Sequence, residues 1–326
     1  PAGQGLNGEQ ALIAPYNTSG DPQVTAFVDM IQGYQPNLWD RRPLPANKAF
    51  PPAPSNVWPD YGLAMLRSDE SPGYWTNEDA IAVFQLMSQG YGHDHRDKFG
   101  IMLYGAGRLL YPDYNALQYE NPTIGWTRNS VSHNTVVVDE QDTRNATPTD
   151  VRHAFSPDVK FLATSASGVF EGVDQTRALL LTSEYLLDLF RLSSDLPHTY
   201  DYLLHAFGEA RPNRPQAFQS SRAMKRRYWL VDDWQSLTTD DGWSLDFSRQ
   251  DPAGSLGGDY GEAWYRHRAS VRVTMAPAPG TFVSHGRWGR ELARMVSERT
   301  KGKRELDQLS RLAVRRADRY DTVFVT

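Results

Sequence analysis

Short apolar and β-branched runs, separated by turn-forming residues, constrain the fold of this chain more than any other feature. From residue 56 onward, Gly, Asp, Asn and Pro interrupt these runs at the frequency expected for turns between strands. Strands at this frequency predict a mainly β fold, built as a large antiparallel β-sandwich. The charged segment 289–319 is the exception, and we expect it to be helical in part. The apolar runs cover residues 80–87, 99–111, 133–139, 160–170, 176–192, 200–207, 227–234, 270–277 and 321–326.

The first 55 residues have a different pattern, with one helical segment followed by a proline-rich stretch. Residues 21–34 carry apolar side chains at helical spacing, behind an aspartate that can cap the helix and a proline in the first turn. Residues 36–59 then contain seven prolines, which is typical of a connector between two architectures. We therefore place a boundary near Ser55, with a helical remnant and linker in residues 1–55 and a β-domain in residues 56–326.

Composition argues against several classes of function. The chain has 34 Lys and Arg against 39 Asp and Glu, a net charge of -5, so it has no basic excess for binding nucleic-acid phosphates. No apolar run approaches the roughly 20 residues that span a bilayer, so no membrane partner is expected. Cysteine is absent, so any metal must be bound by His, Asp or Glu. The 9 Trp, 16 Tyr and 13 Phe suit a β-rich protein or one that stacks on sugar rings.

Two histidines lie two positions apart in the sequence GHDHRD. On a strand, the side chains of His93 and His95 would project from the same face. Asp113 follows two apolar runs joined by a Gly-Ala-Gly turn, so a hairpin over residues 99–111 can return it to the histidines. His133 opens a further β-branched run that can lie alongside. His and Asp are ordinary zinc ligands, and three of them leave one coordination position for water or substrate.

Spacing alone leaves two interpretations of this pattern open. A pair of nearby histidines is more often a hydrogen-bonded structural pair than a metal site, and H-x-H is a weak motif by itself. Asp97 is equally ambiguous. It can accept a hydrogen bond from a ligand histidine, as carboxylates around metal sites do, or lie in a surface turn.

The order and the amino-acid sequences of four segments indicate a family resemblance. GHDHRDKFGIMLYGAGRLLYPDYNA, YENPTIGWTRNSVSHNTVVVDE, GVFEGVDQTRALLLTSEYLLDLFRL and HTYDYLLHAFGEA follow one another between residues 92 and 210. Together they resemble the C-terminal β-domain of the heparinase II/III-like polysaccharide lyases, most closely the alginate lyase branch. The resemblance covers residues 56–210 and is weaker from there to residue 326.

This resemblance implies roles for individual residues. His95, Asp113 and His133 match the family's metal ligands, usually for zinc, with another divalent metal as the alternative. His93 matches the active-site histidine, and Tyr119 matches the active-site tyrosine of the β-domain. The implied activity is β-elimination on an acidic polysaccharide, with alginate or oligoalginate first and a glycosaminoglycan or other uronate polymer second. The implied location is secreted or periplasmic, in a bacterium.

The sequence also departs from the family pattern. Asn115 stands where glycine is usual, and Ser132 stands where alanine is common. These lyases carry, ahead of the β-domain, an (α/α) toroid that supplies an Asn-His pair and a second tyrosine, whereas only residues 1–55 precede the β-domain here. We therefore expect this chain to be a portion of a longer enzyme, with the toroid in the same or another chain. A homodimer is a further alternative.

Three more residues are candidates for substrate contact. Arg177 and His205 lie in segments that match the family, and Trp126 can line a sugar subsite. Each also has a structural interpretation, as a sheet-edge arginine, a hydrogen-bonded core histidine and a packed core aromatic. The principal functional alternative is a non-catalytic, metal-stabilised β-domain that binds carbohydrate or serves a structural role. A metal-dependent hydrolase is less favoured, because the motifs contain no clustered glutamate to act as its acid or base.

Overall fold

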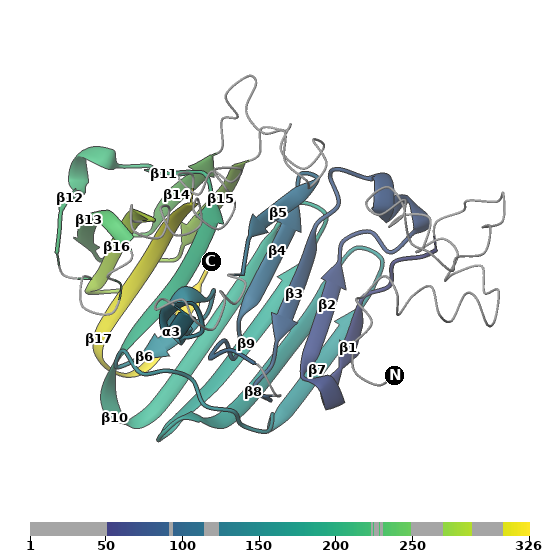
Figure 1. Ribbon diagram of the computed structural model, residues 1–326, viewed down its shortest axis with the longest axis horizontal. Helices are drawn as coiled ribbons and strands as arrows, with labels where there is room; N and C mark the ends of the chain where they lie inside the picture. The colour runs from purple at the N-terminus through teal and green to yellow at the C-terminus, as the bar shows by residue number, and fades with distance from the viewer. Residues whose placement is uncertain are drawn as a thin grey trace, which may run out of the picture.

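The protein is described by a computed structural model over residues 51–90, 94–113, 124–222, 224, 228, 231–248, 270–288 and 309–326. These residues form three antiparallel sheets (Figure 1). The two larger sheets pack against each other, because side chains from both of them share one apolar core. The predicted mainly β, antiparallel sandwich is confirmed.

The first sheet has five strands, ordered along the sheet as they follow in the chain. Its strands are β1 (Asn56–Trp58), β2 (Leu63–Arg67), β3 (Ala82–Leu86), β4 (Ile101–Gly105) and β5 (Arg108–Tyr111). The hairpin between β4 and β5 turns at Ala106 and Gly107, whose φ angles of 50° and 68° lie in the left-handed region. Two such residues are typical of a tight hairpin turn, as the Gly-Ala-Gly sequence predicts.

The second sheet has nine strands. Along it the order is β12, β13, β16, β17, β10, β9, β8 and β7, and β6 also pairs with β10. The long strand β10 pairs with β9 from Leu186 to Ser194 and with β6 from Tyr200 to Tyr202. It therefore links the strand pair β8–β9 to β6, which directly follows the His133 segment. The strands are β6 (Val136–Val138), β7 (Asp150–Phe155), β8 (Lys160–Phe170), β9 (Val173–Leu181), β10 (Leu186–Phe207), β12 (Gln219–Ser220), β13 (Val231–Thr239), β16 (Thr281–Trp288) and β17 (Leu309–Val325).

A small third sheet and a few short helices complete the described part. The sheet contains β11 (Glu209–Pro212), β14 (Trp243–Ser248) and β15 (Ser270–Met275). The helical turns are α3 (Ile124–Thr127), η1 (Pro59–Tyr61), η2 (Pro72–Thr76), η3 (Ser130–Ser132) and η4 (Pro215–Ala217). Among the described residues, no helix has the length and apolar character needed to cross a membrane.

The core between the two larger sheets follows from the alternation of side chains along the strands. In β8, alternate residues from Lys160 to Ala166 are buried and the residues between them are more exposed. Leu66 and Val83 from the first sheet meet Leu162 and Phe190 from the second in one cluster. Each fully buried aliphatic or aromatic side chain contributes about 1.5–3 kcal/mol from its removal from water.

Two expectations from the sequence fall partly or wholly outside the described residues. The helical pattern at residues 21–34 lies outside them, as does most of the proposed remnant in residues 1–55. The charged segment 289–319 is described only from residue 309, where it forms β17 rather than a helix. The reason is tertiary pairing, since β17 lies between β10 and β16 and buries Leu312 and Val314.

We expect the free energy of unfolding to fall at acidic pH because of His285 in β16. Burial lowers the pKa of this histidine from 6.5 to about 4, and its ring packs edge-on against Phe218 at 5.1 Å. Because the folded protein holds the neutral ring, this contribution is complete above pH 6.5 and is lost as the pH falls toward 4. Between pH 7 and pH 4.5 the loss is about 2–3 kcal/mol.

The variant His285→Phe lacks this titration. Its free energy of unfolding, measured by urea denaturation, should fall between pH 7 and pH 4.5 by about 2 kcal/mol less than that of the wild type. All other titrating groups are shared by the two proteins and cancel in the comparison. Parallel stability profiles would show that His285 is not held neutral in the fold.

Candidate functional site

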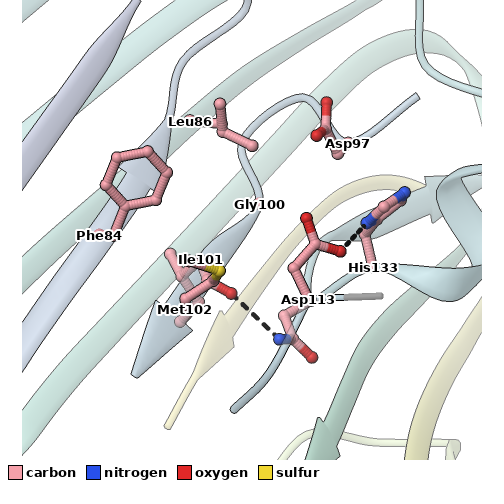
Figure 2. A pocket seen from close by; sticks show the side chains of 9 residues that line it. Phe84, Leu86, Asp97, Gly100, Ile101, Met102, Asp113 and His133 are labelled. Atoms are coloured by element: carbon pink, nitrogen blue, oxygen red, sulfur yellow. Dashed lines mark hydrogen bonds and ion pairs between the residues drawn. The ribbon is translucent and has the colours of Figure 1, made fainter. Parts of the chain in front are cut away.

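Four side chains that can bind a metal ion meet between the end of β5 and the start of β6. One ligand atom from each of His95, Asp97, Asp113 and His133 lies within 4.8 Å of the other three. Nδ1 of His133 is 2.6 Å from Oδ1 of Asp113, and Figure 2 shows these two side chains pointing toward each other. The ring centroids of His95 and His133 are 5.3 Å apart. The structure therefore brings the three predicted ligands together and adds Asp97 to the group.

Local structure explains how these residues meet. The β4–β5 hairpin ends at Tyr111, and Asp113 follows after one proline, as the predicted hairpin requires. His133 follows η3 directly, and its backbone N–H donates to the carbonyl of Ser130 at 3.1 Å. The short turn η3 and the hairpin thus present Asp113 and His133 from two separate segments.

His95 lies in an irregular segment, not on the strand considered for the H-x-H pair. Backbone and side-chain hydrogen bonds attach this segment to the α3–η3 region. The N–H of Arg96 donates to the carbonyl of Arg128 at 2.8 Å, and the hydroxyl of Ser130 donates to the carbonyl of Arg96 at 2.5 Å. These contacts place His95 beside His133 without a strand.

The chemistry of the group fits a divalent metal ion. Nε2 of His133 is buried and makes no hydrogen bond with any residue in the described part of the chain, although an unsatisfied buried polar atom costs about 1–3 kcal/mol. A divalent metal ion can accept the lone pair of this imidazole nitrogen. Imidazole nitrogens and carboxylate oxygens are also the donors that bind zinc where cysteine is absent.

The two histidines have opposite shifts in pKa. Burial and the neighbouring His133 lower the pKa of His95 below 6.5. Burial also acts to lower the pKa of His133, but the charge of Asp113 and the hydrogen bond to it outweigh burial and raise the pKa. His95 is therefore favoured in the neutral form that a metal requires, whereas metal binding at His133 competes with a proton.

A buried lysine supports Asp97. Nζ of Lys98 donates to Oδ2 of Asp94 at 2.9 Å and to Oδ1 of Asp97 at 3.2 Å. Lys98 is only 2% exposed, and its contact with Asp97 is more deeply buried than its contact with the partly exposed Asp94. From the sequence, Asp97 is expected either to accept a hydrogen bond from a ligand histidine or to lie in a surface turn. Asp97 is buried and one of its carboxylate oxygens lies within 4.8 Å of the ligand atoms of the other three residues, so it belongs to the group and is not a surface residue.

Arg177 is buried on β9, which lies between β8 and β10, so it is not the sheet-edge arginine of its structural interpretation, and its substrate contact stays a prediction. Its guanidinium is completely buried and forms a two-point ion pair with Asp188, through Nε to Oδ1 at 2.9 Å and Nη2 to Oδ2 at 2.5 Å. Nη1 donates to the carbonyls of Phe99 and Asn134, the second at 2.9 Å. Arg177 thus connects β9 and β10 to the segments that carry the metal group, the name used here for His95, Asp97, Asp113 and His133. The N–H groups of its guanidinium donate to the Asp188 carboxylate and to these two backbone carbonyls.

His205 and Trp126 are also interior residues, as their structural interpretations expect, and their substrate contacts stay predictions. His205 is 0% exposed on β10, and burial together with the positive Arg311 lowers the pKa of its ring well below 6.5. Trp126 is 6% exposed and packs in a second apolar cluster. The guanidinium carbon of Arg311 lies 6.0 Å from the ring centroid of Trp126 and 5.2 Å from that of Tyr228. This buried arginine could not be predicted, because Arg311 lies in a segment rich in charged residues that are typical of a solvated surface.

The two predicted catalytic residues, His93 and Tyr119, lie outside the described residues, so their roles stay predictions. Both residues are close in sequence to residues of the group. His93 is two residues from His95, and Tyr119 lies between Asp113 and His133.

A small hollow adjoins the metal group on the side of the first sheet (Figure 2). One wall is apolar and comes from Phe84, Leu86, Ile101 and Met102, whereas the other is formed by polar side chains that include Asp97, Asp113 and His133. Of these four apolar residues only Ile101 belongs to the core shared by the two larger sheets, whereas Phe84, Leu86 and Met102 are half-buried residues of the first sheet outside that core.

Comparisons with known proteins match the region of the chain that contains this group. The family model described as heparinase II/III-like, C-terminal, matches residues 51–256, which contain the whole metal group. An exo-oligoalginate lyase from Saccharophagus degradans is 28% identical over 39% of this chain and 21% of that protein. An alginate lyase from Stenotrophomonas maltophilia is 31% identical over 51% of this chain and 26% of that protein. This chain spans about a quarter of the length of these relatives in the aligned regions.

Solved structures show the same fold at low sequence identity. The crystal structure of heparan sulfate lyase HepC from Pedobacter heparinus matches with a TM-score of 0.56 and 13% identity, covering 97% of this chain and 40% of that chain. A crystal structure of heparinase III matches with a TM-score of 0.55 and 10% identity, covering 96% of this chain and 41% of that one. At these identities the likeness concerns the fold alone.

Proposed function

Because this chain belongs to the family of heparinase II/III-like C-terminal domains, we propose that it is the β-domain of a polysaccharide lyase. The reaction is β-elimination on a uronic-acid polysaccharide, with alginate or oligoalginate as the first candidate and a glycosaminoglycan as the second. The observation that carries the proposal is the group of His95, Asp97, Asp113 and His133, assembled within the region that matches the family. The two alginate lyases among its relatives support the choice of substrate.

The reaction sets clear chemical requirements. A base removes the proton on C5 of the uronate, the released electron pair forms the C4–C5 double bond, and the C4–O4 bond breaks as an acid protonates O4. The C5 proton is only weakly acidic, so hydrogen-bond donors must stabilise the charge that develops on the adjacent carboxylate. The site therefore needs a base, an acid and donors to the carboxylate.

In this proposal His93 and Tyr119 act on the C5 and O4 side of the sugar. A tyrosine has an unperturbed pKa of about 10, so a base of this type needs a nearby positive charge to lower its pKa. The remaining donors come from the toroid that this family carries ahead of the β-domain, in the same or another chain. A homodimer remains a further prediction for the assembly.

The metal proposed here is zinc, held by His95, Asp113 and His133 with Asp97 beside them. When bound, the ion supplies a fixed positive charge that holds three separate segments of the chain together. His95 then fixes the neighbouring His93, and Asp113 and His133 fix the two ends of the segment that carries Tyr119. A secreted or periplasmic location completes the proposal, as expected for an enzyme that meets a polymeric substrate outside the cytoplasm.

The activity is tested by incubating the full-length protein with alginate, oligoalginate and several glycosaminoglycans. We expect ultraviolet absorbance from the unsaturated uronate product to rise, with alginate or oligoalginate fastest. If carbohydrate binds but absorbance stays flat on every substrate, the non-catalytic carbohydrate-binding alternative holds instead. A rise only on glycosaminoglycans would keep the lyase and change the substrate class.

Removal of one metal ligand should separate metal binding from the rest of the fold. We expect His95→Ala to lose most of its zinc by elemental analysis and to melt at a lower temperature. A ligand present at 100 times its Kd stabilises the folded state by about 2.7 kcal/mol. A strong chelator should therefore lower the melting temperature of the wild type and leave that of the variant unchanged.

The matched control is His153→Ala, because His153 lies exposed on β7. It should keep both the zinc and the response to chelator. Full zinc content in His95→Ala would remove His95 from the set of ligands.

A further inference from the structure

The side chain of Asn134 lies at the point where three elements of the site meet. Asn134 is 2% exposed, and its amide group makes three hydrogen bonds. Nδ2 donates to the carbonyl of Ile101 in β4 at 3.0 Å and to the carbonyl of Pro112 after β5 at 3.1 Å. Oδ1 accepts from the backbone N–H of His205 in β10 at 2.8 Å. One amide therefore joins both sheets of the sandwich.

These partners are next to metal ligands in the chain. Pro112 directly precedes Asp113, and Asn134 directly follows His133. The hydrogen bond from Nδ2 of Asn134 to the carbonyl of Pro112 thus fixes the separation between the backbones that carry the two ligands. The same two ligands form the 2.6 Å contact between Nδ1 of His133 and Oδ1 of Asp113.

The backbone of Asn134 is fixed as firmly as its side chain. Its carbonyl accepts from the N–H of Ile101 at 3.2 Å and from Nη1 of Arg177 at 2.9 Å. Arg177 is in turn held by the buried carboxylate of Asp188. Asn134 therefore cannot shift relative to the core without breaking buried hydrogen bonds, and this rigidity is transmitted to His133 and to Pro112.

We propose that Asn134 is a positioning residue of the metal centre, which holds Asp113 and His133 at their binding separation before the ion arrives. This inference rests on the metal site of the proposed function and extends it to a residue that contacts no metal. Residues that orient metal ligands typically contribute 10–100-fold to affinity. A residue that only stabilised the fold would change the melting temperature of the metal-free protein and leave the affinity of its folded fraction unchanged.

The test uses zinc affinity, measured by competition with a chromophoric chelator on the full-length protein. Asn134→Asp keeps the size of the side chain and the acceptor for His205, and it removes both N–H donors. Asn134→Ser is a second variant, whose smaller side chain leaves space for water at the freed carbonyls. We expect the Kd for zinc to rise at least 10-fold in both variants.

Leu245→Ala is the control for general destabilisation. Leu245 is completely buried in β14 of the third sheet, and its truncation costs about 2–5 kcal/mol without touching the metal group. We expect its Kd for zinc to equal that of the wild type, although its melting temperature falls.

The outcomes distinguish this inference from the function on which it rests. Wild-type affinity in a folded Asn134 variant would overturn the role of Asn134 and leave the metal site intact. Failure of both variants to fold would also overturn it, because Asn134 would then serve the fold in general. An absence of zinc binding by the wild type would remove the metal site itself, and this inference with it.

Discussion

Tyr119→Phe should lose about 10²–10⁴-fold in turnover while it keeps its fold and its zinc, because proton transfer by a positioned side chain contributes that much to catalysis. Phenylalanine preserves the ring and removes only the hydroxyl. The measurement is kcat for product formation on the best substrate, together with zinc content and melting temperature. A loss of turnover accompanied by unchanged zinc content assigns the hydroxyl to the chemistry and not to the structure.

The matched control for this variant is Tyr185→Phe. Tyr185 lies in the turn between β9 and β10 and is 55% exposed. The variant Tyr185→Phe is therefore expected to turn over substrate at the wild-type rate. If Tyr119→Phe also kept the full rate, the family-based role of Tyr119 would be wrong, and the base or acid would have to come from another residue.

Arg177→Met should be among the most destabilising single substitutions in the described part of the chain. Arg177 and Asp188 are both buried, and removal of one partner from a buried ion pair costs about 3–5 kcal/mol because the other charge is left uncompensated. The carbonyl of Phe99 also loses a donor, and the carbonyl of Asn134 loses one of its two donors, keeping the N–H of Ile101. We expect the free energy of unfolding, measured by urea denaturation, to fall by this amount.

Two further variants sharpen the result for Arg177. The double variant Arg177→Met with Asp188→Leu removes both charges and should recover part of the loss, since no unpaired charge remains buried. Arg152→Met is the matched control, because Arg152 pairs with Asp150 at the surface, where ion pairs contribute little. Equal effects in Arg177→Met and Arg152→Met would contradict the supporting role assigned to the buried pair.

Much of the fold and part of the site could be predicted from the sequence, for identifiable physical reasons. Strand alternation and turn residues report local geometry, and so they predicted the antiparallel sandwich and the hairpin that returns Asp113 to the histidines. Spacing drew attention to the histidines and to Asp113, and the family resemblance then selected His95, Asp113 and His133, which the structure brings within 4.8 Å.

The points that the sequence left open have a common cause, which is that burial depends on packing between layers. Arg177 and His205 are polar residues on strands, and the sequence does not tell whether their faces meet water or a second sheet. β17 shows the same limit, since its many charges indicated a partial helix although pairing with β10 and β16 makes it a strand. Asn134 was missed because its role lies in contacts with Ile101 and Pro112, which are distant in sequence.

The central claim is elimination rather than hydrolysis, and mass spectrometry of the products tests it most directly. The full-length protein is incubated with a defined oligouronate, and the masses of the two products are added. β-Elimination predicts that they sum to the mass of the substrate, with an unsaturated uronate at the new non-reducing end. A sum larger by one molecule of water, with no unsaturated product, would identify a hydrolase and contradict the account.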